Sequence, residues 1–211
     1  MTEKGVFITF EGCEGAGKTT VLEHVYASLK EDGRKVMKTR EPGGIDIAEK
    51  IRSIILDPEH TMMERRTEAL LYAAARRQHL VEKVIPALKN GYIVLCDRFI
   101  DSSLAYQGAA RGIGMEEVLS MNQFAIEDHF PDATIYLDIT PDQGLTRIRD
   151  NKKREFNRLD QEAINFHKEV YEAYQTLLER FPDRIHKIEA DMPVEDVVQE
   201  TKNHILSVLN R

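Results

Sequence analysis

The sequence contains no tryptophan and only two cysteines, Cys13 and Cys96, among its 211 residues. The two cysteines form neither a CxxC pair nor a Cys/His cluster, which argues against a disulfide framework and a structural zinc site. A chain of this length buries enough surface to form a core without cross-links. We therefore expect both thiols to be buried apolar groups in a protein of the reducing cytoplasm.

Long hydrophobic runs and an excess of positive charge are also missing. The longest apolar runs, such as Ile93–Cys96, are far shorter than the ~18 residues that cross a bilayer. The first residues lack the apolar stretch of a secretory signal. The 29 Lys and Arg against 36 Asp and Glu give a formal charge of −7, whereas broad nucleic-acid binding needs a basic face. We expect no membrane and no nucleic-acid partner.

Short apolar, β-rich runs recur at 5–10, 35–39, 91–96, 133–139 and 184–189, with amphipathic helical stretches between them. This alternation predicts an α/β fold with a parallel sheet. The first helix is expected from about Gly17 to Lys30, with Gly33 as its carboxyl-terminal cap. No linker, repeat or low-complexity tract interrupts the pattern, so we expect one domain over residues 1–211.

A phosphate-binding loop follows the first predicted strand. Residues 12–19 match GxxxxGK[ST] in full, between a strand and a helix. Glycines let backbone N–H groups approach phosphate oxygens, and the helix amino terminus adds its positive dipole end. Lys18 is predicted to contact the β- and γ-phosphates of ATP, and Thr19 to bind Mg²⁺. The predicted ATP-binding residues are Gly12, Cys13, Glu14, Gly15, Ala16, Gly17, Lys18, Thr19 and Thr20. The alternative is a glycine-rich turn without function.

A predicted strand that ends in an acid also supports this interpretation. The apolar run Tyr92–Cys96 is followed directly by Asp97. In parallel α/β sheets, ligands bind beyond the carboxyl ends of the strands, so Asp97 and the phosphate loop are expected to share one crevice. Asp97 is predicted to hold Mg²⁺ directly or through water. The alternative role for Asp97 is a helix cap or a turn residue.

Four classes of phosphate-loop protein compete for this sequence. A GTPase needs an [NT]KxD motif, and the nearest match, Asn151–Arg154, ends in arginine instead of aspartate. A transporter ATPase needs an LSGGQ-like signature, which the sequence lacks, and helicases are generally longer. A small-molecule kinase fits the size, and a nucleotide-binding module without chemistry remains the alternative outside the enzymes.

Arginines spread over separate elements indicate the nature of the acceptor. Arg40, Arg52, Arg76 and Arg98 carry planar guanidinium groups, which suit a phosphate-bearing acceptor. The second pKa of a phosphate monoester is about 6, so such an acceptor is already deprotonated at neutral pH. No strong general base is then needed, whereas the hydroxyl acceptor of a deoxynucleoside kinase would need one. The alternative for these arginines is a set of surface groups.

Several motifs together resemble those of bacterial thymidylate kinases. They are Phe10–Gly12, Thr39–Gly44, Tyr72–His79, Asp97–Phe99 and Ser102–Gly108, in order along essentially the whole chain. The resemblance implies an α/β three-layer P-loop kinase fold with a central parallel five-stranded sheet flanked by helices and a basic lid. It also implies ATP- and Mg²⁺-dependent phosphorylation of dTMP to dTDP by a homodimer.

The resemblance also implies roles for residues at matching positions. Asp97 and Arg98 match the family's DRY-type motif, with Phe99 in place of the more usual tyrosine. Tyr72 falls where the family stacks an aromatic ring on thymine, although the pattern alone favours a core aromatic on a helix over 64–80. The implied dTMP-binding residues are Glu41, Pro42, Arg52, Tyr72, Arg76, Arg98, Ser102, Ser103, Tyr106 and Gln107. Arg76 would bind the edge of the base, Ser103 and Gln107 would complete its recognition, and Tyr106 would crowd a ribose 2′-hydroxyl.

The segment 147–158 carries six basic and two acidic residues, a balance of +4 in an acidic chain. The phosphate loop itself supplies only Lys18, so another cation must neutralise the transferring phosphoryl group. As in one branch of the resembling family, the segment is expected to be a lid that brings in Arg149, Lys153 or Arg154 as a catalytic group. A solvated basic loop is the alternative. The seven histidines show no metal-binding spacing and are assigned no role.

Overall fold

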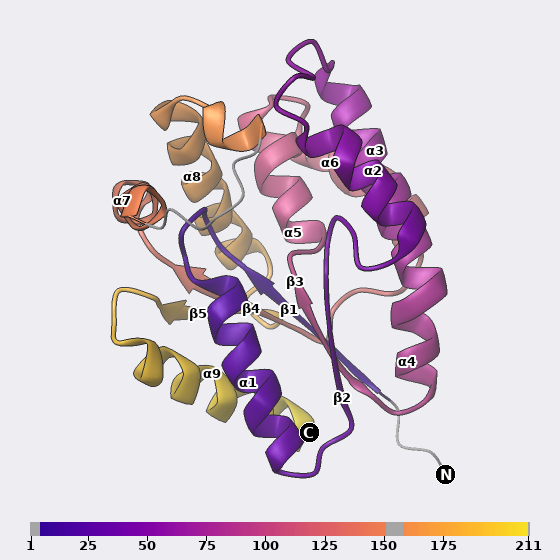
Figure 1. Ribbon diagram of the computed structural model, residues 1–211, viewed down its shortest axis with the longest axis vertical. Helices are drawn as coiled ribbons and strands as arrows, with labels where there is room; N and C mark the ends of the chain where they lie inside the picture. Colours follow the sequence, from indigo (N-terminus) through magenta and orange to yellow (C-terminus); the bar gives the residue numbers. More distant parts are fainter. Residues whose placement is uncertain (1–4, 151–157, 211) are drawn as a thin grey trace.

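The computed structural model describes residues 5–150 and 158–210. Its centre is a five-stranded sheet in the order β2-β3-β1-β4-β5, and every strand pair is parallel (Figure 1). The strands are β1 (Val6–Glu11), β2 (Val36–Arg40), β3 (Ile93–Asp97), β4 (Ala133–Asp138) and β5 (Ile185–Glu189). Each strand begins and ends within two residues of its predicted range. The predicted parallel sheet is therefore confirmed.

Helices cover both faces of the sheet (Figure 1). The α-helices are α1 (Lys18–Glu31), α2 (Asp46–Leu56), α3 (Arg65–His79), α4 (Ile85–Lys89), α5 (Ile100–Ser103), α6 (Met115–Ile126), α7 (Pro141–Asp150), α8 (Ile164–Arg180) and α9 (Val194–Leu209). Two π-helical turns, η1 (Leu80–Val84) and η2 (Leu104–Ala110), and a 3₁₀ turn, η3 (Arg158–Gln161), complete the order. Helix α1 lies within one residue of its predicted start and end.

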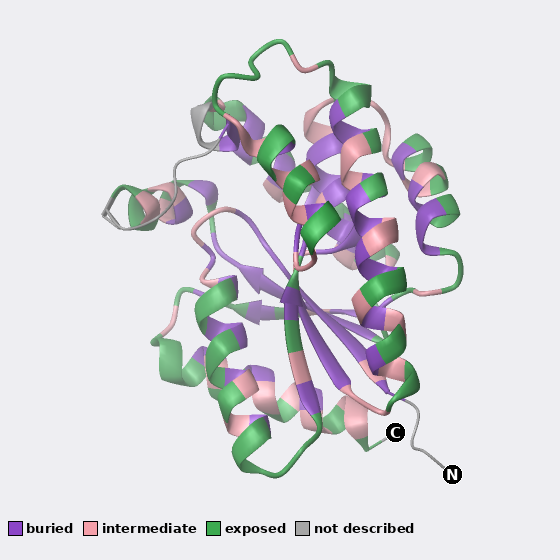
Figure 2. Ribbon diagram, turned by 45° about the vertical axis from the view of Figure 1, so that its right-hand side comes forward, coloured by how far each residue is buried: buried purple, intermediate pink, exposed green. Residues whose placement is uncertain are grey.

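The alternation of side chains along the strands creates two cores. Phe7 of β1 joins the core between the sheet and the layer of α3, η2 and α8, and Ile8 and Phe10 join the core under α1 and α9. Each fully buried side chain of this size contributes roughly 1.5–3 kcal/mol through apolar burial. Figure 2 shows buried strands between helices whose outer faces are exposed. Burial on both faces explains why the strands read as nearly continuous apolar runs.

The parallel register aligns the strand ends that build the site. Phe10 of β1 and Arg40 of β2 both pair with Asp97 of β3. The loops that follow these three strands therefore open at the same edge of the sheet. Among the described residues, no helix is long and apolar enough to cross a membrane.

Candidate active site

The phosphate loop joins β1 to α1 through glycines in the left-handed region. Gly12 has a φ of 143° and Gly17 a φ of 86°, values that side-chain-bearing residues rarely adopt. A Cβ atom on Gly12 would lie 2.6 Å from the carbonyl oxygen of Leu137, so the β4 backbone also requires glycine there. Gly17 caps the 14-residue helix α1, whose free N–H groups face the loop and favour an anion.

Lys18 is buried against this loop. Its Nζ donates to the carbonyl oxygens of Gly12 at 3.0 Å and Cys13 at 2.9 Å. Burial, reinforced by the nearby charge of Arg98, lowers the pKa of Lys18 to about 8. Burial raises the pKa of the Cys13 thiol to about 12. The thiol therefore stays neutral, and Lys18 holds a poorly solvated charge that a phosphate can neutralise.

Two oxygen groups meet at the end of β3. The Thr19 hydroxyl donates to the Asp97 carboxylate at 2.5 Å. Mg²⁺ is held by a few protein oxygens and completes its shell with water and substrate phosphates, so this pair fits a Mg²⁺–nucleotide complex. No group of three or more His, Cys, Asp or Glu residues able to hold a metal occurs in residues 5–150 and 158–210. The donor set suits a metal that arrives with its phosphate ligands.

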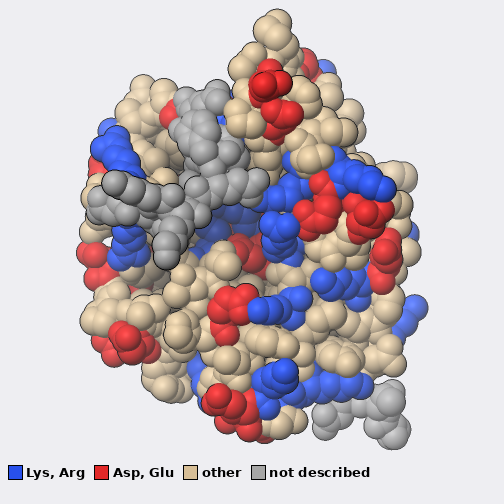
Figure 3. Space-filling model, viewed as in Figure 1, with Lys and Arg blue, Asp and Glu red and all other residues tan. Residues whose placement is uncertain are grey.

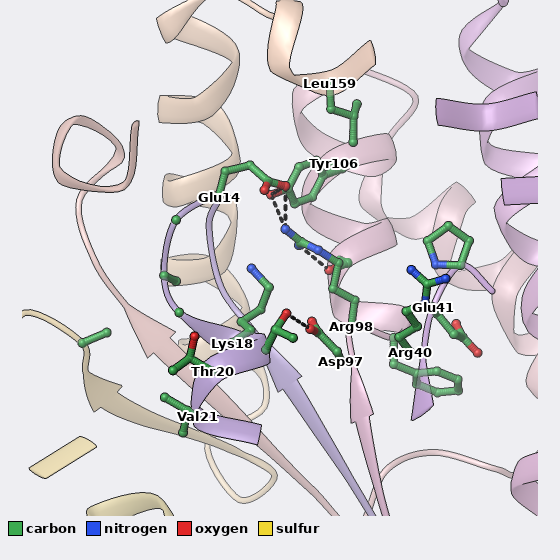
Figure 4. Close-up of a pocket in the computed structure, with 18 of the residues that line it drawn as sticks. Glu14, Lys18, Thr20, Val21, Arg40, Glu41, Asp97, Arg98, Tyr106 and Leu159 are labelled. Carbon is green, nitrogen blue, oxygen red and sulfur yellow. Dashed lines mark hydrogen bonds and ion pairs between the residues drawn. The ribbon is translucent and has the colours of Figure 1, made fainter. Parts of the chain in front are cut away.

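Arg98 projects into the space between the phosphate loop and η2 (Figure 4). Its Nη2 donates to Glu14 at 2.6 Å and its Nη1 to Ser102 at 3.0 Å, while its guanidinium carbon lies 5.0 Å from the centre of the Tyr106 ring. Arg98 has a φ of 67°. A non-glycine residue in this region is strained and is held by its surroundings, as is common at functional sites.

Glu11, at the end of β1, fixes the turn that presents Arg98, a role that the sequence did not reveal. Its Oε1 accepts from the backbone N–H of Phe99 at 2.7 Å and of Ser102 at 3.2 Å. Its Oε2 accepts from the Ser102 hydroxyl at 2.5 Å and the Tyr174 hydroxyl at 2.9 Å. Burial, together with the charge of Asp101, raises the pKa of Glu11 to about 7. An acid closing an apolar strand was the one signal in the sequence.

Arg76 of α3 lies on the acceptor side and is only 2% exposed. Its Nε donates to Glu41 at 2.8 Å, its Nη1 to Ser103 at 3.0 Å and to Asn122, and its Nη2 to the carbonyl oxygen of Phe99 at 2.9 Å. These bonds use four of the five N–H donors of a guanidinium group. Among the residues that the structure describes, none accepts from the second Nη2 donor, which is therefore available to a ligand.

His79, to which the sequence analysis assigned no role, holds Glu41 from the other side. Its Nδ1 lies 2.8 Å from the Glu41 Oε1 atom, and its Nε2 lies 2.7 Å from the Thr39 hydroxyl. His79 is fully buried. It thus links β2 to α3 and orients the carboxylate that holds Arg76. No spacing in the sequence indicates this link, because the bonded side chains are far apart in the chain.

One cavity of about 710 Å³ joins these groups beyond the strand ends, and Figure 3 shows Lys and Arg side chains gathered in this hollow. The predicted residues that line it are Glu14, Gly15, Ala16, Gly17, Lys18, Thr19, Thr20, Glu41, Pro42, Arg52, Tyr72, Arg76, Asp97, Arg98, Ser102, Ser103, Tyr106 and Gln107. Gly12 and Cys13 belong to the loop but do not line the cavity, and Cys13 is 3% exposed. The structure therefore brings both predicted groups of binding residues into one space.

The two ends of the basic segment 147–158 contact the rest of the protein through Arg147 and Arg158. Arg147 and Arg149 belong to α7, where Arg147 donates to the carbonyl oxygen of Ala190 at 2.9 Å and Arg149 is exposed outside the cavity lining. Arg158 is buried and pairs with Glu68 of α3, because that carboxylate offers it a partner inside the protein. Lys153 and Arg154 lie outside the described residues.

Comparison with known proteins identifies the family. The family model described as thymidylate kinase matches residues 10–201. The chain is 62% identical to a thymidylate kinase of Oceanobacillus iheyensis over 98% of this chain and 92% of the relative. It is 61% identical to that of Bacillus velezensis over 98% of each. The crystal structure of the Ehrlichia chaffeensis thymidylate kinase superposes with a TM-score of 0.77 at 30% identity, covering 95% of this chain and 98% of that one. The fold and these similarities show that the chain belongs to the thymidylate kinase family.

Proposed function

We propose that the protein transfers the γ-phosphoryl group of ATP to dTMP within the 710 Å³ cavity. The products are ADP and dTDP, and dTDP is used in the synthesis of dTTP. The relatives at about 60% identity carry the name of this activity. The observation that supports it best is that Lys18, in the phosphate loop, and Arg98, on the acceptor side, line the same cavity. One cavity can therefore hold a donor phosphate next to an acceptor phosphate.

On the donor side, the loop N–H groups and Lys18 would bind the β- and γ-phosphates. Thr19 and Asp97 would hold Mg²⁺, which neutralises phosphate charge when bound. During transfer, the bond from the γ-phosphorus to the β–γ bridging oxygen breaks, and a bond to a dTMP phosphate oxygen forms. That acceptor oxygen is already deprotonated at neutral pH, so no base has to remove a proton. Catalysis then consists of alignment and charge compensation.

On the acceptor side, Arg52 and Arg98 would bind the dTMP phosphate, and Arg76 and Gln107 would read the base. Tyr72 lies in the cavity wall, in reach of a base that stacks on its ring. The Tyr106 ring is 3% exposed and is held beneath Arg98, so it would close the space beside the sugar. Glu41 and Pro42 from the β2 loop, with Ser102 and Ser103, complete this wall.

We also propose that residues 1–211 form one kinase domain that acts as a homodimer in the cytoplasm. Its two cysteines are free and buried, which suits a reducing compartment. Helices α2, α3 and α6 form one layer (Figure 1), and Leu70 of α3 and Phe124 of α6 are 58% and 90% exposed there. Exposed apolar side chains on neighbouring helices suit a contact with a second copy. Arg149, Lys153 and Arg154 are proposed as the further cations of the transfer step.

A coupled assay of ADP release with dTMP and with thymidine tests the proposed function. We expect Mg²⁺-dependent turnover with dTMP and little with thymidine, because thymidine lacks the phosphate that the arginines bind. Turnover of thymidine alone would instead indicate a deoxynucleoside kinase. ATP binding without turnover of any monophosphate would indicate a binding module.

A further inference from the structure

The side chain of Gln107 is fixed by a carboxylate that the site assignments above do not include. Gln107, in η2, is 2% exposed and lines the cavity. Its Nε2 lies 2.8 Å from the Oε1 atom of Glu68, on α3. Glu68 is itself only 1% exposed. It stands four residues before Tyr72, so both side chains lie on the same face of α3.

This contact determines which way the Gln107 amide points. An ionised carboxylate only accepts hydrogen bonds, so the atom next to it must be the NH₂ group and not the carbonyl oxygen. The Oε1 atom of Gln107 then points away from Glu68. In the described parts of the chain, no protein group donates a hydrogen bond to it. An acceptor in the cavity wall is thereby left for a ligand.

Two arginines keep Glu68 ionised. Arg158 donates to its Oε2, and Arg111 lies 3.3 Å from both carboxylate oxygens. Burial alone would raise the pKa of Glu68, but the charges of Arg111 and Arg158 and the bond from Gln107 outweigh it. The pKa of Glu68 consequently lies below its ordinary value. Glu68 remains an acceptor throughout the neutral range.

Building on the proposed function, we infer that Glu68 is a positioning residue that sets base specificity by locking the Gln107 carbonyl toward the acceptor base. Thymine carries a donor at ring N3 and an acceptor at O4. It therefore matches the Gln107 carbonyl and the remaining Arg76 donor. Cytosine carries an acceptor at N3 and a donor at N4, so it opposes both groups. Selection of thymine would then depend on a carboxylate that does not touch the base.

Replacement of Glu68 by glutamine should reverse this orientation. The introduced amide has one acceptor oxygen, and charge-assisted bonds from Arg158 and Arg111 to that oxygen are stronger than a bond from a neutral amide. The introduced NH₂ group would therefore face Gln107, which would turn its own carbonyl toward that group and its NH₂ toward the base. We expect Glu68→Gln to lower the ratio of the dCMP to the dTMP dissociation constant by at least roughly tenfold, measured by calorimetry.

Three further variants separate orientation from stability. In a Gln107→Leu background, Glu68→Gln should change the dCMP/dTMP ratio no further, because its effect requires the amide. Arg158→Gln removes the partner of the other carboxylate oxygen and should reduce stability while the ratio stays near that of the wild type. Glu68→Asp keeps the negative charge beside Arg111 and Arg158, but its shorter side chain moves the carboxylate away from Gln107. This variant therefore tests the inference if Glu68→Gln does not fold. We expect Glu68→Asp to lower the ratio too.

The outcomes distinguish this inference from the proposed function. If wild-type protein does not phosphorylate dTMP, the proposed function itself fails. If dTMP is phosphorylated and Glu68→Gln or Glu68→Asp lowers the ratio only in the presence of Gln107, the inference holds. An unchanged ratio in folded variants, or an equal change in the Gln107→Leu background, overturns it.

Discussion

At the scale of single residues, the site holds positive charge where water is scarce. Lys18 is balanced by two loop carbonyls, and Arg98 is balanced by Glu14. Both arrangements replace hydration with fixed partners, so the charges stay oriented before a nucleotide arrives. A phosphate that enters regains electrostatic energy that burial had cost. The protonation state of Lys18 and the pairing of Arg98 therefore control ligand affinity directly.

The pKa of Lys18, about 8, predicts pH-dependent ATP binding. Phosphate favours the protonated lysine and raises its pKa, so binding takes up a proton once the pH exceeds about 8. Mg²⁺–ATP affinity should be constant near pH ~6.5, well below the pKa of Lys18, and should fall as the pH rises through that pKa. Calorimetry in two buffers of different ionisation enthalpy measures the proton uptake. Lys18→Ala should abolish turnover and the uptake, and uptake that persists in this variant would rule out Lys18 as its source.

Replacement of Arg98 should weaken the acceptor and spare the donor. The charge-assisted contact with a phosphate contributes about 1.5–3 kcal/mol, so dTMP affinity should fall at least roughly tenfold in Arg98→Ala. Arg52→Ala should behave in the same way. ATP affinity should change little, because Lys18 and the loop remain in place. Calorimetric titrations with each nucleotide test this, and equal losses for ATP and dTMP would contradict the assigned roles.

At the scale of elements, the sequence predicts strands, helices and loop motifs but not the side-chain bonds between separate elements. The strands follow from short apolar, β-rich runs, α1 follows from the amphipathic stretch after the first run, and the phosphate loop follows from its glycine spacing. The bonds from Glu11 to Phe99, from Glu41 to His79 and from Glu68 to Arg158 join residues 88, 38 and 90 positions apart. Nothing in a local pattern specifies such partners, because the packing of separate elements brings them together.

Substitution of Glu11 tests how strongly its bonds hold the turn after β3 in place. Glu11→Ala leaves the backbone N–H groups of Phe99 and Ser102 without their acceptor, and each buried donor left unsatisfied costs about 1–3 kcal/mol. The free energy of unfolding should fall by at least that amount, and dTMP affinity should fall as Arg98 loses its support. Glu11→Gln should be milder, since its carbonyl still accepts both N–H groups. Urea denaturation of the two variants measures the difference, and equal stability would contradict this role.

At the scale of the whole molecule, helix α3 takes part in both the cavity and the proposed contact between copies, because Tyr72 and Arg76 line the cavity while Leu70 of the same helix is exposed. The cavity opens at the carboxyl ends of the strands, whereas Leu70 and Phe124 lie on the outer layer of helices. Phe124→Asp places a charge in the proposed dimer contact and should shift the molecular mass in light scattering from dimer to monomer. Met62→Asp is the control, because Met62 is 93% exposed in the loop between α2 and α3. A dimer that survives Phe124→Asp would place the contact elsewhere.

The transferring phosphoryl group needs more positive charge than the phosphate loop provides. Transfer spreads negative charge over three oxygens of the phosphoryl group, while the phosphate loop adds Glu14 beside Lys18 and an acidic chain surrounds both. Cations from the segment 147–158 would complete the compensation in the transition state. The combined variant Arg149→Ala, Lys153→Ala and Arg154→Ala should therefore lower kcat roughly 10³-fold and leave ATP and dTMP binding nearly unchanged.

A matched variant separates this local effect from a change in net charge. Lys30, Arg34 and Lys89 are exposed at the end of the sheet remote from the cavity, and their replacement by alanine removes the same three charges. Steady-state kinetics should show near-normal kcat for this control. If the variant in 147–158 also kept its kcat, Arg52 and Arg98 would have to supply the compensating charge, and their replacement would then lower kcat as well as dTMP affinity. Pre-steady-state transfer rates measured on both variants decide between the two sources, because they report the chemical step without product release.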